Sequence, residues 1–321
     1  MLVSTLVPTR NRPLELKRAL DSIARQTHRE MEVIVVDDAS TPENAQANKG
    51  LVEAAGARAT YVFSPADSGP AQTRNVGIKC AKGDLVAFCD DDDYWCDDEH
   101  LESAVRAFLG DSSLDLVFAN QQAHENGKLV RPVWLPHLAD RLALAHRSSH
   151  PGVRVSKRDC LIDDHGHLNT CVFRRDLLLG IGGFWEALQY LEDLDLFVRA
   201  VDSARHVEYR HHTASVHNIP DRTLKVNAST RLDNSAKEFV KVNVANHLIH
   251  CCRSVEARRY ANRLAGYAYR HLAMDASKLK FDGAAFRFAR LALTWLPTLR
   301  WSAYTVFLGF KALLAKPRAR S

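Results

Sequence analysis

The chain has 321 residues, of which 46% are hydrophobic and 25% are charged. These values are those of an ordinary folded globule, and they exclude disordered, collagen-like and low-complexity proteins. The net charge of +5 is unevenly spread: residues 1–204 carry 22 Lys/Arg and 31 Asp/Glu, a net of −9, whereas residues 205–321 carry 21 and 7, a net of +14. Two regions with different surroundings are therefore expected.

The first 120 residues alternate between strand-like and helix-like patterns. Pro13 is placed to open a helix, and apolar residues then recur at helical spacing up to position 24. Further helices are expected around residues 73–81 and 101–109. Short apolar runs predict buried strands over residues 2–7, 33–36, 59–63, 85–89 and 114–119.

This alternation predicts an α/β fold with a mostly parallel sheet flanked by helices. In such sheets the ligand lies beyond the carboxyl ends of the strands. Polar or acidic residues follow three of the predicted strands, at positions 8–11, 37–38 and 90–93. We expect them to gather at one edge of the sheet.

The later parts of the chain differ in pattern. Residues 121–170 contain three prolines and predict loops and a short hairpin that cover the site. Order returns over residues 171–218. Beyond about residue 221 Gly and Pro become rare and the pattern is helical, so an α-helical C-terminal extension is expected.

Cysteine usage and apolar runs bear on the cellular compartment. The seven cysteines are scattered, and their odd number argues against a disulfide framework. None of them forms a CxxC pair, so the usual spacing of a zinc site is absent from the sequence. The first apolar run is too short for a signal peptide, and none reaches the ~18–20 residues of a spanning helix. We expect reduced thiols and a cytoplasmic protein.

The strongest chemical signal is the acidic run, residues 90–93, four aspartates that follow a predicted buried strand. Four adjacent carboxylates repel one another and need a cation when they are buried. Carboxylate oxygens suit Mg²⁺ or Mn²⁺, which also bind substrate phosphates. The alternative is a solvated acidic loop, but the apolar strand before the run directs it inward.

Three further patterns are weaker when taken alone. Asp193 lies at the predicted start of a helix. It is either a general base or an acid that only stabilises the N-terminus of the helix. Gly69 precedes a predicted helix that carries Arg74, an arrangement that suits an anion. Four histidines lie within twelve residues and form either part of a metal or diphosphate site or a surface cluster. They are at positions 206, 211, 212 and 217.

Together these residues resemble the family 2 glycosyltransferases, nucleotide-sugar transferases of the GT-A fold. The resemblance spans roughly residues 1–217 and rests on the order of its motifs, at positions 7–12, 22–27, 35–40, 69–75, 81–84, 90–93, 173–176, 182–184 and 192–193. It implies a catalytic domain over residues 1–218 and a basic α-helical region over residues 219–321.

The resemblance also implies roles by position. Asp193 corresponds to the catalytic base, and the nucleotide would be bound by Pro8, Thr9, Arg10, Asp38, Gly69, Arg74 and Asp91. Asp90 and Asp92 correspond to the metal-binding acids, with His212 preferred to His217 as the late histidine. The cofactor implied is Mn²⁺ or Mg²⁺. Two departures are Asp91, where a small residue is usual, and Arg10, where many members have an aromatic residue.

The implied reaction is an inverting, single-displacement transfer of a sugar, most often from a UDP-sugar, to a hydroxyl acceptor in cell-surface polysaccharide or glycolipid assembly. One alternative is a nucleotidyltransferase, although its Gly-rich and Lys signature after the first strand is replaced by residues 8–11. The other is a non-catalytic module that binds nucleotide-sugars, against which the retention of both the acidic run and Asp193 argues.

The end of the chain has its own composition. Residues 283–321 contain seven Lys/Arg and no Asp/Glu, interleaved with Trp, Phe and Leu. This mixture suits peripheral contact with the inner face of an anionic membrane. Alternatively these helices pack on the catalytic domain or on a second subunit of a homo-oligomer. No nucleic-acid recognition motif is visible.

Overall fold

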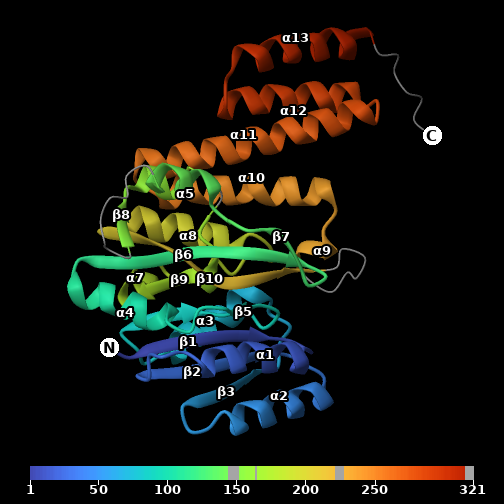
Figure 1. Cartoon of the computed structure of the whole chain (residues 1–321). Helices are drawn as coiled ribbons and strands as arrows, with labels where there is room; N and C mark the ends of the chain where they lie inside the picture. Colours follow the sequence, from blue (N-terminus) through green and yellow to red (C-terminus); the bar gives the residue numbers. More distant parts are fainter. Residues whose placement is uncertain (144–151, 163–164, 221–227, 315–321) are drawn as a thin grey trace. The chain divides into compact units, whose positions relative to one another are not determined.

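A computed structural model describes residues 1–143, 152–162, 165–220 and 228–314 (Figure 1). The chain divides into two compact units, Met1–Asn227 and Ala228–Ser321. The sequence placed a domain boundary after residue 218, whereas this division falls at residue 227. Each unit is described by itself.

The first unit is built on one mixed sheet in which the strands follow the order β3-β2-β1-β4-β9-β6-β10-β5, with β7 on β6 and β8 on β10. The β1, β2, β3 and β4 strands pair in parallel, as do β6 and β10, while β9 runs antiparallel between β4 and β6. The strands are β1 (Val3–Thr9), β2 (Met31–Asp38), β3 (Ala59–Ser64), β4 (Leu85–Phe88), β5 (Tyr94–Trp95), β6 (Leu114–Glu125), β7 (Lys128–Arg131), β8 (Gly152–Val155), β9 (Cys171–Arg174) and β10 (His206–Ile219).

Helices flank this sheet, and four of them begin at a proline, a position where the missing N–H costs nothing. They are α1 (Pro13–Ala24), α2 (Pro42–Ala54), α3 (Pro70–Cys80), α4 (His100–Gly110), α5 (Pro136–Ala143), α6 (Lys157–Cys160), α7 (Arg175–Gly180) and α8 (Glu192–Ser203), with a short 3₁₀ turn η1 (Leu168–Thr170). The sequence analysis did not identify α2, because its apolar face is weak: Asn48 and Val52 are its buried residues.

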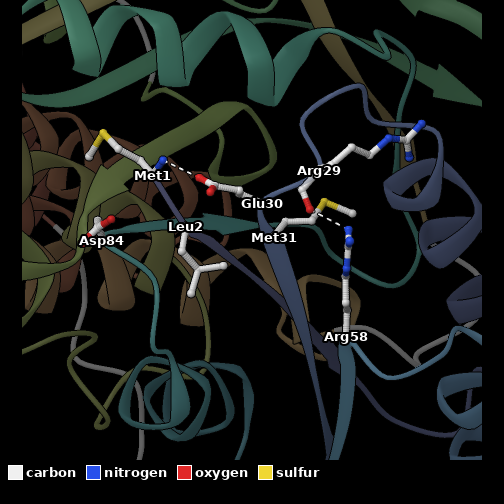
Figure 2. Close-up of a pocket in the computed structure, with 7 residues that line it drawn as sticks. All are labelled: Met1, Leu2, Arg29, Glu30, Met31, Arg58 and Asp84. Carbon is white, nitrogen blue, oxygen red and sulfur yellow. Dashed lines mark hydrogen bonds and ion pairs between the residues drawn. The ribbon is translucent and has the colours of Figure 1, made fainter.

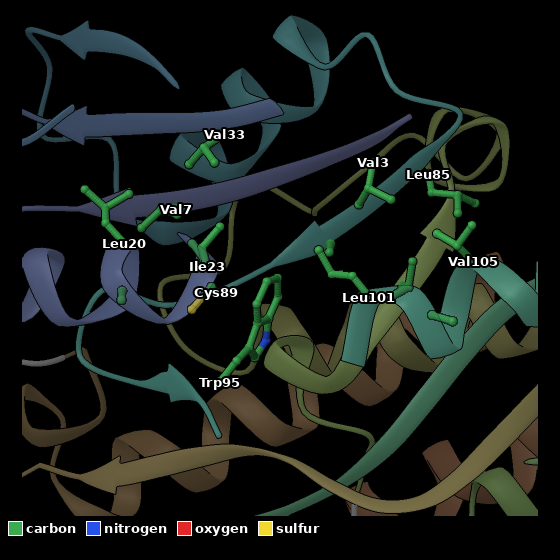
Figure 3. Close-up of a cluster of buried hydrophobic side chains, with 14 of the residues drawn as sticks. Val3, Val7, Leu20, Ile23, Val33, Leu85, Cys89, Trp95, Leu101 and Val105 are labelled. Atoms are coloured by element: carbon green, nitrogen blue, oxygen red, sulfur yellow. The ribbon is translucent and has the colours of Figure 1, made fainter. Parts of the chain in front are cut away.

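A hydrophobic core cluster lies between the sheet and the helices α1 and α4 (Figure 3). Leu16, Leu20 and Ile23 of α1 are buried there, which confirms the helical face that the sequence predicts. Trp95 is fully buried at the centre and donates its indole N–H to the carbonyl of Asn169 at 2.6 Å. This hydrogen bond fixes η1 against the chain that follows the acidic run.

Residues 121–170 are more regular than the sequence suggests. The β6 strand continues to Glu125 and turns through Asn126 and Gly127 into β7, both with positive φ of 51° and 74°. This is the backbone that an Asn-Gly hairpin favours, and it is the predicted hairpin. Predicted loop residues 144–151 and 163–164 lie outside the described residues.

The second unit is helical and comprises α9 (Ala228–Arg231), α10 (Asn234–Cys251), α11 (Val255–Lys278), α12 (Asp282–Trp295) and α13 (Leu299–Leu314). The side chains of Asp233 and Ser254 cap α10 and α11 by accepting from backbone N–H groups. Alanines at α12 positions 285, 289 and 292 are fully buried. None of the helices within the described ranges is long and apolar enough to cross a membrane.

Candidate active site

The acidic run follows β4 and contacts a threonine hydroxyl and an arginine side chain at the end of β1 and just after it. Thr9 donates its hydroxyl to Asp91 at 2.8 Å, and the Arg12 guanidinium lies 2.9 Å from both Asp91 and Asp92. Burial and the adjacent Asp92 raise the pKa of Asp91 to about 7, against the opposing effect of Arg12. The carboxyl edge of the parallel strands therefore carries a balanced cluster of charges rather than an open acidic loop.

Arg74, on α3, joins the acidic run to the start of α8. Its guanidinium lies 2.6 Å from an Asp90 oxygen and 2.8 Å from a Glu192 oxygen, and its side chain is only 7% exposed. Burial opposes ionisation of Asp90, but Arg74 outweighs burial and holds the pKa of that carboxyl below its usual value. Burial raises the pKa of Glu192. Arg74 thus holds the two acidic motifs together.

Asp93, the last member of the run, is held by residues far along the chain. It accepts from Asn169 at 2.6 Å and from the backbone N–H of Asn218 at 2.7 Å, and it lies 2.9 Å from His217. Burial raises the pKa of Asp93 to about 6. Burial acts to lower the pKa of His217, but Asp93 outweighs it and raises that pKa to about 9. The pair is therefore ionised at neutral pH.

A divalent cation fits beside this pair. Asp93, His167 and His217 each place one ligand atom within 4.8 Å of the others. Burial lowers the pKa of His167 to about 3, so its imidazole is neutral and retains a lone pair. A mixed carboxylate and imidazole set suits Mn²⁺ better than Mg²⁺. His217 would have to release its proton to serve as a ligand.

His212 and His217 lie apart on β10. His212 is 3.5 Å from both His100 and Asp97, whereas His217 contacts the acidic run. The structure thus brings His217 to the site and does not bring His212 there. Burial lowers the pKa of both His212 and His100, which is consistent with structural histidines between β10 and the start of α4.

Asp193 lies in the first turn of α8, next to a histidine that the sequence analysis did not select. The Nε2 atom of His165 is 2.9 Å from the Asp193 carboxylate, whose other oxygen accepts the Leu194 N–H at 2.8 Å. Burial alone raises the pKa of Asp193, but His165 outweighs it and the net pKa lies well below the usual range. Asp193 is therefore a carboxylate, 23% exposed, that stays ionised.

The predicted nucleoside-binding residues lie at the carboxyl ends of β1 and β2. Asp38 accepts the backbone N–H groups of Ser68 and Gly69 at 3.0 and 2.9 Å, which anchors the loop between β3 and α3. Arg10 pairs with Asp67 of the same loop. Pro8 lies on β1 beside Val36 of β2. Asp38 and Arg10 are thus engaged by the loop that would cover a nucleoside.

The Gly182-Gly183-Phe184 motif is explained by packing. Asn75 accepts the Phe184 N–H at 2.8 Å and donates to the Phe184 carbonyl at 2.9 Å. Gly183 has φ of +67°, and a Cβ there would lie 2.5 Å from the Asn75 side-chain oxygen. Arg199 donates to the Gly183 carbonyl at 2.8 Å. This loop therefore ties α3 to α8, the helices that carry Arg74 and Asp193.

A hollow of about 530 Å³ lies at the opposite edge of the sheet, at the amino ends of β1 and β2 (Figure 2). It is lined by Met1, Leu2, Arg29, Glu30, Met31, Arg58 and Asp84. The Met1 amino group lies 2.7 Å from Glu30 and partly closes it. None of the predicted site residues lines this hollow.

Comparison with known proteins is consistent with this geometry. The family model described as glycosyl transferase family 2 matches residues 4–178. An uncharacterized glycosyltransferase of Haemophilus influenzae is 25% identical over 287 residues, which cover 88% of this chain and 89% of that protein. The poly(ribitol-phosphate) β-N-acetylglucosaminyltransferase TarS of Staphylococcus aureus is 35% identical over 135 residues, 40% of this chain and 22% of its own length.

Solved structures show the same fold. Staphylococcus aureus TarS 1–349 in complex with UDP-GlcNAc has a TM-score of 0.67 at 20% identity, over 98% of this chain and 88% of that one. The mannosyltransferase PcManGT of Pyrobaculum calidifontis, solved with GDP-Man and Mn²⁺, has a TM-score of 0.58 at 21% identity, over 98% and 88%. These similarities concern the arrangement of the backbone.

Proposed function

Because the chain belongs to glycosyl transferase family 2, we propose that it transfers a sugar from a nucleotide-sugar to a hydroxyl acceptor with inversion at the anomeric carbon. The observation that carries the proposal is the link made by Arg74, which holds the acidic run next to the helix that bears Asp193. One group of residues would thus receive the diphosphate, and the other would activate the acceptor.

The donor is proposed to be a UDP-sugar. TarS was solved with UDP-GlcNAc, and the residues assigned to the nucleoside, Pro8, Thr9, Arg10, Asp38 and Gly69, lie on β1, β2 and the loop before α3. Arg74 and Asp91 would lie near the diphosphate and the ribose. An acceptor in cell-surface polysaccharide or glycolipid is supported by the poly(ribitol-phosphate) in the name of TarS.

A divalent cation, Mn²⁺ or Mg²⁺, is proposed at the acidic run. Asp90 and Asp92 are the acids assigned by position, and His217, which lies 2.9 Å from Asp93 of the same run, takes the place of His212. PcManGT, which has the same fold, was solved with Mn²⁺. A cation bound there supplies positive charge for the departing diphosphate.

The chain's own residues define the acceptor side of the reaction. Asp193, ionised and partly exposed, accepts the proton of the acceptor hydroxyl. The hydroxyl oxygen then forms a bond to the anomeric carbon as the bond from that carbon to the diphosphate oxygen breaks. His165 acts as a positioning residue that holds the Asp193 carboxylate through its Nε2 atom. Arg12 and Arg74 place positive charge beside the leaving group.

The test is the Asp193→Asn variant, with Asp21→Asn, an exposed acid on α1, as the matched control. Release of UDP from UDP-sugars in the presence of Mn²⁺ and a hydroxyl acceptor should fall by about 10²–10⁴-fold in the variant, the contribution of a general base. Nucleotide affinity, measured by calorimetry, should stay unchanged. Unchanged turnover would remove Asp193 from the role of base.

A further inference from the structure

The outer side of α13 is an apolar face. Six large side chains on this helix are 58–93% exposed: Leu299, Val306, Phe307, Phe310, Leu313 and Leu314. Their spacing, i, i+7, i+8, i+11, i+14 and i+15, places them on one side of a helix with 3.6 residues per turn. Such a stripe normally faces a core, but here it is the solvent-facing side.

The opposite side of α13 is already used for packing. Leu308 is fully buried in a cluster with alanines of α11 and α12, and Trp301 and Tyr304 pack against the same cluster. The Trp301 indole N–H donates to the carbonyl of Ala289 at 3.1 Å. These contacts set the rotation of α13 about its axis, so the apolar face cannot turn inward without losing them.

The charge of α12 and α13 is predominantly positive, and their one acid, Asp282, is already paired with Lys311 of α13 at 2.8 Å. Asp282 is the last acidic residue of the chain, and residues 283–321 carry seven Lys/Arg. Arg287 and Arg290 of α12 and Arg300 of α13 are exposed. Three more basic residues follow α13 in the sequence, at positions 316, 318 and 320. Within the described residues, Arg287, Arg290 and Arg300 therefore add positive charge to the two helices that carry and support the apolar stripe.

We propose that the outer face of α13 docks on an anionic lipid membrane, with the helix lying in the interface. An apolar stripe flanked by Arg and Lys is the pattern of helices that lie in the plane of a membrane. A second copy of this chain fits less well, because a symmetric contact would bring two basic segments together without acids to offset them. The inference goes beyond the proposed transfer reaction and does not depend on it.

The test is vesicle flotation of the full chain, using vesicles of phosphatidylcholine alone or mixed with phosphatidylglycerol. The wild type should float with the anionic vesicles, and added salt should reduce the bound fraction. The affinity of the double variant Phe307→Asp/Phe310→Asp for the anionic vesicles should be lower by about tenfold or more. The matched control is Leu109→Asp, since Leu109 is 67% exposed on α4 of the other unit and should leave binding unchanged.

Sugar-transfer activity in detergent-free solution and the thermal midpoint should be the same in all three proteins, which shows that the variants are folded. Equal flotation of the double variant and the wild type would overturn the proposal. So would a wild type that stays in the soluble fraction with anionic vesicles. Self-association at low salt that the double variant abolishes, without vesicle binding, would instead assign the face to a second copy.

Discussion

At the scale of single residues, Arg74 is the connection on which the site depends. It contacts Asp90 after β4 and Glu192 at the start of α8; the contact with Glu192 is buried and the contact with Asp90 is partly buried. A buried carboxylate that loses its cation costs about 3–5 kcal/mol. This residue was predicted to bind nucleotide, and the structure adds that it already neutralises two acids of the protein.

His165 carries the sharpest prediction at this scale. The variant His165→Ala removes the group that contacts Asp193 at 2.9 Å. Because His165 holds the pKa of Asp193 down, its loss should raise that pKa. The acidic limb of the kcat/KM profile should then move to higher pH, and kcat should fall with little change in the KM for the donor.

The control is His165→Gln, whose side-chain amide can still donate to the carboxylate and should restore part of kcat. An acidic limb that coincides with that of the wild type in both variants would show that His165 acts only in folding.

The sequence analysis missed Arg12 and His165 for different reasons. Arg12 stood inside the motif at positions 7–12, but no role was assigned to it, and the structure shows it between Asp91 and Asp92. His165 lies in a region without periodicity, so no local pattern distinguished it. Its role follows from a contact across 28 positions.

At the scale of elements, the loop before Phe184 joins α3 to α8. Gly182 and Gly183 both have positive φ, of 78° and 67°, but only Gly183 has no room for a Cβ. A side chain at position 182 would therefore meet backbone strain alone, whereas one at position 183 would meet both backbone strain and a close contact.

The variants Gly182→Ala and Gly183→Ala should therefore differ in stability. In each variant, placing an L-residue in the left-handed region should lower the free energy of unfolding by about 1–2 kcal/mol. Gly183→Ala should lose more, because its Cβ displaces the Asn75 side chain that pairs with Phe184. Urea unfolding of both variants measures the difference. Equal free energies of unfolding would mean that the contact with Asn75 adjusts without cost.

Element prediction succeeded where periodicity was strong and failed where it was weak. Helix α1 buries a regular apolar stripe, and it was predicted from its first residue, Pro13. Helix α2 buries almost no apolar surface, and it was not predicted. In β10 the register shifts between Arg210 and Ser215. Because each shift changes which side chains face the site, counting along the sequence could not choose between His212 and His217.

At the scale of the whole molecule, ligand binding should be visible as stability. UDP with Mn²⁺ at about 100 times its dissociation constant should add about 2.7 kcal/mol. For a unit of this size the thermal midpoint should rise by about 5–10 °C. EDTA should remove most of the shift if the cation joins the diphosphate to the acidic run. A thermal shift that is the same with EDTA would contradict a metal site there. A larger thermal shift with GDP than with UDP would indicate that the nucleotide base of the donor is guanine.

The charge split seen in the sequence now has a structural counterpart. The acidic part of the chain contains carboxylates that are matched by Arg12, Arg74 and, from β10, His217. The basic part includes β10 and the helical unit, whose last helix exposes an apolar face. The small net charge of +5 is the sum of two regions of opposite net charge.

The sequence by itself determined the α/β class, the order of the motifs and the position of the acidic run, because strand and helix periods and apolar runs are local properties. Only the tertiary structure decided the partners within the site. Those contacts join residues up to 126 positions apart, and they depend on β9 lying between β4 and β6 and on the irregular register of β10. Pairings of this kind are set by sheet order and burial, which no local pattern records.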